Sequence, residues 1–147
     1  MSIKVHSLDS HHVGLIALLV CALASAVCCS NFSNEQGKVL DVLQSELPIP
    51  NGFTLVSQGA VSKLSHASST RRYNCLSPYS EVKTFYLGAL EPKGWRLVSE
   101  QPVQYRGESY GGCSLVFARD EYQVTVQYAG TPEPEYGWDY AVSVSWE

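Results

Sequence analysis

The segment YQVTVQY, residues 122–128, places an apolar or aromatic side chain at every second position, and YAVSVSW, residues 140–146, repeats the pattern. Successive side chains of a strand point to opposite faces, so each segment predicts a strand with one buried and one solvated face. CSLVFA, residues 113–118, is a further predicted strand, joined to the next by a short hairpin link at residues 119–121. This part of the chain therefore predicts an antiparallel sheet.

The segment SPYSEVKTFYLGALEPKG, residues 77–94, predicts the main helix. Ser77 is a suitable N-cap, and Pro78 suits the first helical position because its missing N–H costs nothing there. Pro92 prevents continuation, and Gly94 can adopt the left-handed conformation that ends a helix. One apolar face is predicted from residues at the helical period, namely Val82, Phe85, Tyr86, Ala89 and Leu90.

Four more elements complete the predicted fold. Residues 33–47 show an amphipathic helix pattern, residues 53–61 and 67–76 read as strands, and Trp95 begins another strand with a ring that covers the helix end. The expected fold is α+β, with an antiparallel sheet of about five to six strands and one main helix on one face. An N-terminal apolar helix and the short amphipathic helix precede it.

The N-terminal segment VGLIALLVCALASAVCC, residues 13–29, carries no charge and no proline. Three interpretations remain open: a signal peptide cleaved after Ala24-Ser25-Ala26, a retained membrane anchor, or a lipid-modified Cys28 or Cys29. Each places the rest of the chain outside the cytoplasm, in the cell envelope or periplasm if the source is bacterial, or secreted. The predicted organisation is residues 1–29 as signal peptide or anchor, 30–47 as a short helix or linker, and 48–147 as one domain.

The composition excludes several classes of function. The formal net charge of −4 removes the main source of affinity for a phosphate backbone, so no nucleic-acid partner is expected. The carboxylates Glu133, Glu135 and Asp139 match no calcium-loop spacing, and no metal or other cofactor is predicted. The sequence motifs that identify zinc proteases, nucleotide-binding loops and serine hydrolases are absent from the sequence.

Two cysteines lie in the body of the chain, Cys75 and Cys113. An oxidising compartment predicts a disulfide between them, and two separate buried thiols are the alternative. His66 is the only histidine beyond the N-terminal segment, so a small enzyme that uses His66 with one of the cysteines is a second hypothesis for function.

Aromatic residues in predicted loops are the candidate binding residues: Tyr105, Tyr110, Tyr136 and Trp138. Rings beside glycine can stack on sugars or peptides, which predicts a carbohydrate or cell-wall binding site as a further alternative. Ordinary packing of these rings over the sheet edge is the competing interpretation.

The segment FYLGALEPKGWRLV, with LPIPNGFTLVS before it and CSLVFARDEYQVTVQ after it, resembles a pattern of uncharacterised bacterial secreted proteins and lipoproteins. The resemblance covers about residues 47–147 and is most specific at Phe85-Tyr86 and Gly94-Trp95. It implies a fold and an extracytoplasmic setting, and it implies no activity.

We therefore expect an extracytoplasmic, non-enzymatic binding or structural module. Its partners would be a membrane, through residues 13–29 if they are uncleaved, and an envelope protein or glycan.

The mass of the protein recovered from cells tests the interpretation of the N-terminal segment. Loss of residues 1–26 would indicate a cleaved signal peptide, because small residues at Ala24 and Ala26 suit a signal peptidase. An intact mass would indicate a retained anchor, and an added acyl mass would indicate a lipid on Cys28 or Cys29.

Overall fold

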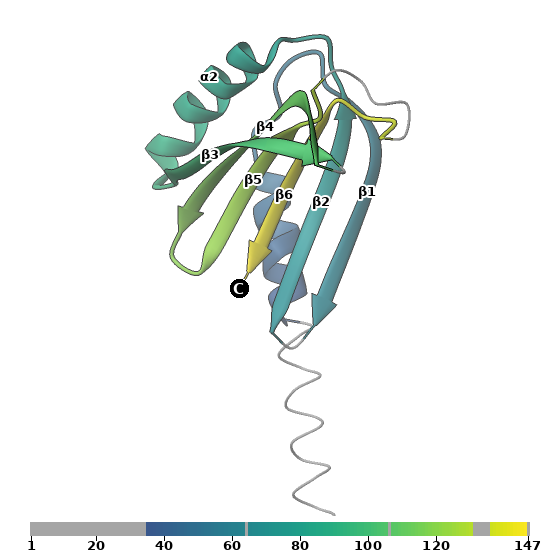
Figure 1. The fold of residues 1–147 in the computed structure, drawn as a ribbon. Coiled ribbons are helices and arrows are strands. Elements are labelled where there is room, and N and C mark those ends of the chain that lie inside the picture. Colours follow the sequence, from purple (N-terminus) through teal and green to yellow (C-terminus); the bar gives the residue numbers. More distant parts are fainter. Residues whose placement is uncertain (1–34, 64, 106, 131–135, 147) are drawn as a thin grey trace, which may run out of the picture.

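The computed structural model describes residues 35–63, 65–105, 107–130 and 136–146, which form one six-stranded antiparallel sheet and two helices (Figure 1). The α+β class and the predicted number of strands are confirmed. The predicted N-terminal apolar helix, with Cys28 and Cys29, lies outside the described residues. In the described part of the chain, no helix has both the length and the apolar character needed to cross a membrane.

The elements are a helix over residues 35–46, β1 Thr54–Lys63, β2 His66–Asn74, α2 Tyr79–Leu90, a 3-10 turn Glu91–Lys93, β3 Arg96–Tyr105, β4 Glu108–Arg119, β5 Tyr122–Tyr128 and β6 Tyr140–Trp146.

The order of the strands in the sheet is β1-β2-β6-β5-β4-β3. β1 and β2 form a hairpin at one edge, and α2 then carries the chain to the opposite edge, where β3 begins (Figure 1). β3, β4 and β5 return as a meander, and β6 inserts between β5 and β2 and pairs with both. The last strand in sequence therefore joins the two halves of the sheet.

One core lies between one face of the sheet and both helices. The alternation predicted for the last third of the chain is confirmed, because Val124, Val126, Val142 and Val144 are all buried. The predicted amphipathic helix is also confirmed. Leu40 of the helix and Leu47 just after its end are buried in the same core, so this helix packs as part of the domain.

The other sheet face carries small polar side chains. The residues predicted to face water lie here and are half-buried by their neighbours: Gln123, Thr125, Gln127, Ser143 and Ser145. The hydroxyls of Thr70 on β2 and Ser143 on β6 form a hydrogen bond of 2.9 Å across this face. Cross-strand pairs of this kind stabilise a solvated sheet face without apolar burial.

Both ends of α2 follow local chemistry, but the start differs from the prediction. The helix begins at Tyr79 with Pro78 as its N-cap and has no side-chain cap, so the prediction of Ser77 as N-cap was wrong. At the other end α2 stops at Leu90, and the 3-10 turn Glu91–Lys93 follows it. Gly94 ends this turn in a left-handed conformation with φ of 84°, as predicted. Trp95 is buried at the helix exit, and the Arg119 guanidinium lies 4.4 Å from its ring centroid.

A matched pair of truncations tests the placement of the core. Phe117 is fully buried on β4, whereas Leu55 on β1 is 51% exposed. Phe117→Ala should lower the free energy of unfolding by about 3–5 kcal/mol, because it removes a buried ring and leaves a cavity. Leu55→Ala should change it by less than about 0.5 kcal/mol. Equilibrium denaturation measures both values, and equal effects would contradict the assignment.

Candidate functional site

The four candidate aromatic residues do not form one cluster of loop residues. Tyr105 is the last residue of β3 and Tyr110 lies within β4, so the prediction that both lie in loops was wrong. The Tyr110 hydroxyl forms a hydrogen bond of 3.0 Å with the Glu108 carboxylate. Tyr136 and Trp138 do lie together before β6, with ring centroids 5.2 Å apart at 47°. Both rings are half-buried and tilted relative to each other.

The predicted disulfide is not formed, and both Cys75 and Cys113 are free. Register explains why: Tyr73 pairs with Tyr140, Tyr140 with Tyr128, and Tyr128 with Cys113. The strand that leads to Cys75 is thus three strand spacings, about 14 Å, from Cys113. A disulfide requires Cα atoms within about 7 Å of each other. The positions of the two cysteines in the sequence do not indicate that β6 and β5 lie between β2 and β4.

His66 lies far from both thiols. It pairs with Lys63 at the β1–β2 turn, seven residues along β2 from Tyr73. Seven residues of strand span about 23 Å, and both cysteines lie near the Tyr73 end. The residues of the predicted Cys/His enzyme are therefore not brought together.

Asp139 has a structural role in the loops. Its carboxylate accepts a hydrogen bond of 2.9 Å from the Cys75 N–H, and its main chain bonds to Tyr73 and Ala129. Glu133 and Glu135, the other two carboxylates considered as calcium ligands, lie outside the described residues. Within the described ranges no group of side chains could hold a metal ion.

A row of five aromatic rings crosses the helix-covered face of the sheet. Phe53 contacts both Tyr73 and Tyr140, Tyr140 stacks on Tyr128, and Tyr128 stacks on Tyr79 of α2, with ring centroids 5.0–5.9 Å apart. Burial raises the pKa of the tyrosine hydroxyls in this row at positions 73, 79 and 140. These phenols are therefore neutral at physiological pH, and the row is a packing feature.

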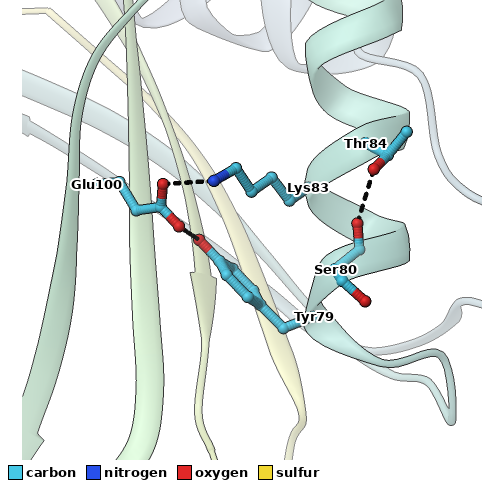
Figure 2. Close-up of polar contacts among 5 residues, drawn as sticks. All are labelled: Tyr79, Ser80, Lys83, Thr84 and Glu100. Carbon is cyan, nitrogen blue, oxygen red and sulfur yellow. Dashed lines mark hydrogen bonds and ion pairs between the residues drawn. The ribbon is translucent and has the colours of Figure 1, made fainter.

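Beside this row, α2 is tied to the edge strand β3 by a polar cluster (Figure 2). Glu100 of β3 accepts a hydrogen bond of 2.9 Å from the Tyr79 hydroxyl and forms an ion pair with Lys83. Hydrogen bonds from Lys83 and Tyr79 lower the pKa of Glu100 below its ordinary value. Figure 2 also shows Thr84, whose hydroxyl donates a hydrogen bond of 2.9 Å to the Ser80 carbonyl of its own helix.

The opposite edge of the sheet, β1, is open. All ten residues of β1 are exposed, and β2 is its one strand neighbour among the described residues (Figure 1). From Ser57 to Lys63 its pairing with β2 is regular, with no proline and no charge before Lys63. Its outer main-chain groups thus form a template on which another strand can pair.

The edge strand β3 is protected in the ways that natural sheets use. Its pairing with β4 is interrupted at two places, and Pro102 lacks an N–H to donate. Charged residues also lie along it, including Arg96 and Glu100. The difference between the two edges marks β1 as the surface suited to a partner.

A groove runs beside β1, on the face that carries the helix over residues 35–46. Its volume is about 420 Å³ and its lining residues are Asp41, Gln58, Gly59, Ala60, Ser69 and Arg71. Asp41 comes from the helix, and the others come from β1 and β2. The Arg71 guanidinium donates a hydrogen bond of 3.4 Å to the Gln44 main-chain carbonyl. This bond positions the Arg71 side chain, which lines the groove.

A second groove, of about 360 Å³, lies between α2 and the loop before β1. Its lining includes Ile49, Pro50, Val82 and Phe85, with Glu81 at its rim. No row of unpaired strand groups borders it. The groove beside β1 is the stronger candidate because it combines side-chain contacts with a main-chain template.

Comparisons of the chain with protein-family models, with curated proteins and with solved structures give no match.

Sequence reasoning missed the β1 site, although it predicted β1 as a strand. One signal was present: residues 53–76 contain three Lys or Arg residues and no Asp or Glu. That asymmetry in an acidic chain could have identified the hairpin as a distinct surface.

Two tyrosine substitutions test how α2 and β6 pack in the core. Tyr86 is fully buried, and its hydroxyl has no hydrogen-bond partner among the described residues, whereas the Tyr140 hydroxyl donates to the Ser77 carbonyl at 2.9 Å. Tyr86→Phe should leave the free energy of unfolding unchanged or raise it, because a desolvated hydroxyl is removed. Tyr140→Phe should lower it by about 1 kcal/mol. Urea denaturation compares them, and a larger loss for Tyr86→Phe would contradict this packing.

Proposed function

We propose that the protein is a non-enzymatic, extracytoplasmic binding module that takes an extended peptide segment of a partner protein as an added strand on β1. The observation that carries the proposal is the ten-residue edge strand exposed along its whole length. In this mode of recognition main-chain hydrogen bonds supply affinity, and pockets for alternate side chains supply specificity.

The exposed apolar side chains of β1 support this use of the edge. Leu55, Val56 and Val61 are each about half exposed, at 51%, 47% and 49%. An exposed edge with such side chains and few charges is prone to pair with other strands. A partner strand would bury these side chains and satisfy the outer main-chain groups together.

The groove beside β1 supports specificity. An added strand would turn every second side chain toward the helix-covered face, where Gln58, Ser69 and Arg71 line the groove. Gly59 and Ala60 have the smallest side chains of the groove lining, so they leave room for a side chain of the partner strand to reach across β1 toward β2.

The non-enzymatic part of the proposal is supported by the positions of the nucleophile and base candidates. His66 lies at the turn end of the hairpin, and Cys75 and Cys113 lie near the other end of the sheet. A nucleophile and its base must lie within hydrogen-bonding reach of each other. The extracytoplasmic part is supported by the apolar segment at residues 13–29.

Selection from a displayed library of random ten-residue peptides tests the proposal. The target is the full chain, kept in solution with a mild detergent because of residues 13–29. The selected peptide should slow amide hydrogen exchange within Thr54–Lys63, because strand pairing protects the outer N–H groups of β1.

Backbone N-methylation of the selected peptide provides the control. Only alternate N–H groups of an added strand point at β1. Methylation at one set of alternate residues should therefore weaken binding at least about tenfold, equivalent to one or two lost hydrogen bonds, and methylation at the other set should not. Failure to select any peptide, protection away from β1, or equal effects of the two sets would refute strand addition.

A further inference from the structure

The β1–β2 hairpin is positively charged within an acidic protein. Residues 53–76 carry Lys63, Arg71 and Arg72, with His66 at the turn, and no Asp or Glu, whereas the whole chain has a formal net charge of −4. The remainder of the chain is therefore more acidic than the total suggests. The hairpin is the part of the molecule that attracts negative charge.

These cations have no acidic partner within the described part of the chain. The one ion pair found there, Lys83 with Glu100, joins α2 to β3 at the opposite edge. Arg71 instead donates to the main-chain carbonyl of Gln44, which fixes its position without neutralising its charge. Asp41 lines the same groove but forms no ion pair with Arg71. A positioned guanidinium without an ion-pair partner favours a carboxylate, which it can bind with two parallel hydrogen bonds.

Register places the two arginines on opposite faces beside the edge strand. Arg71 pairs with Gln58 and lies toward the groove, and Arg72 pairs with Ser57 and lies toward the open face. An added strand would likewise direct alternate side chains to the two faces. Acidic side chains on either face of that strand would thus meet a guanidinium across a small or polar residue of β1.

We infer that the partner segment is an acidic extended peptide, with a carboxylate held by Arg71 in the groove beside β1. This inference rests on the proposed strand addition at β1. It adds the chemistry of the partner, which the open edge alone does not determine.

Charge favours this occupant over a second copy of the chain. Pairing β1 with β1 of another molecule would bring two hairpins of the same positive charge side by side, and like charges in contact oppose association. Arg71 and Arg72 also lie on opposite faces of the hairpin, so one flat anionic membrane surface cannot contact both. The membrane remains an outcome that the experiment can detect.

Substitution of Asp41 tests whether a carboxylate of the partner binds at Arg71. It is the acidic residue that lines the groove, on the wall formed by the helix over residues 35–46. A carboxylate bound at Arg71 would be repelled by Asp41. Asp41→Asn should therefore tighten the binding of an acidic peptide by about two- to fivefold, and leave a neutral peptide unaffected.

The experiment uses the decapeptide selected on the full chain, which should carry Glu or Asp at alternate positions. Fluorescence anisotropy compares it with a version in which these residues are replaced by Gln or Asn, and with a Lys version. The acidic peptide should bind at least about tenfold more tightly than the amide version, as one charge-assisted hydrogen bond predicts, and the Lys version should not bind measurably. Higher salt should reduce this difference.

Variants locate the contact. Arg71→Gln should weaken the acidic peptide about tenfold or more and leave the amide version unchanged, while Arg96→Gln on β3 is the matched control and should change neither. Arg71 also contacts the helix over residues 35–46, so thermal denaturation checks each variant. The peptide series on the unmodified protein stands independently if Arg71→Gln unfolds.

The outcomes separate the two proposals. A selected peptide without acidic residues, or equal binding of the acidic and amide versions with protection of β1, would overturn the acidic partner and leave strand addition intact. No protection of β1 by any peptide would refute strand addition itself. Arg71-dependent binding to vesicles containing phosphatidylserine, without competition by the acidic peptide, would overturn the inference in favour of a membrane.

Discussion

The insertion of β6 between β2 and β5 is the constraint on which the rest of the structure depends. β6 pairs along seven residues with each neighbour and buries Tyr140, Val142 and Val144. Without it the β1–β2 hairpin and the β3–β5 meander would be separate sheets, and a two-stranded hairpin alone is at best marginally stable. Because β6 occupies the inner side of β2, the hairpin must lie at the edge of the sheet. Among the described strands, β1 therefore has a neighbour on one side only.

The two edge strands of the sheet, β3 and β1, differ in sequence and in packing. At β3 the sequence supplies interruptions, a proline and charges, and α2 adds the contacts of Tyr79 and Lys83 with Glu100. At β1 it supplies none of these between Ser57 and Ser62. An open edge is a hazard for aggregation, which natural proteins usually remove. Its presence in a protein that protects its other edge is the reason to assign a binding role to β1.

Much of the fold could be predicted from sequence, because its signals are local. Period two in residues 122–128 and 140–146 gave two strands, and Pro92 with Gly94 gave the end of α2. What failed depended on strand order, which local patterns do not contain. A disulfide between Cys75 and Cys113 was predicted, but two strands lie between the strands that lead to them. Tyr105 and Tyr110 were predicted in loops, but β3 and β4 extend beyond their apolar segments and include both residues. The β1 site was missed for the same reason, since only the sheet order shows which strand is an edge.

Residue-resolved amide hydrogen exchange of the protein alone tests the central claim most directly. The account predicts slow exchange for Val142 and Val144 at the centre of the sheet, and fast exchange at alternate positions of β1, whose outer N–H groups have no strand partner among the described residues. Exchange as slow throughout β1 as in β6, with no partner added, would show that another part of the chain already covers the edge. That result would contradict the assignment of β1 as a binding surface.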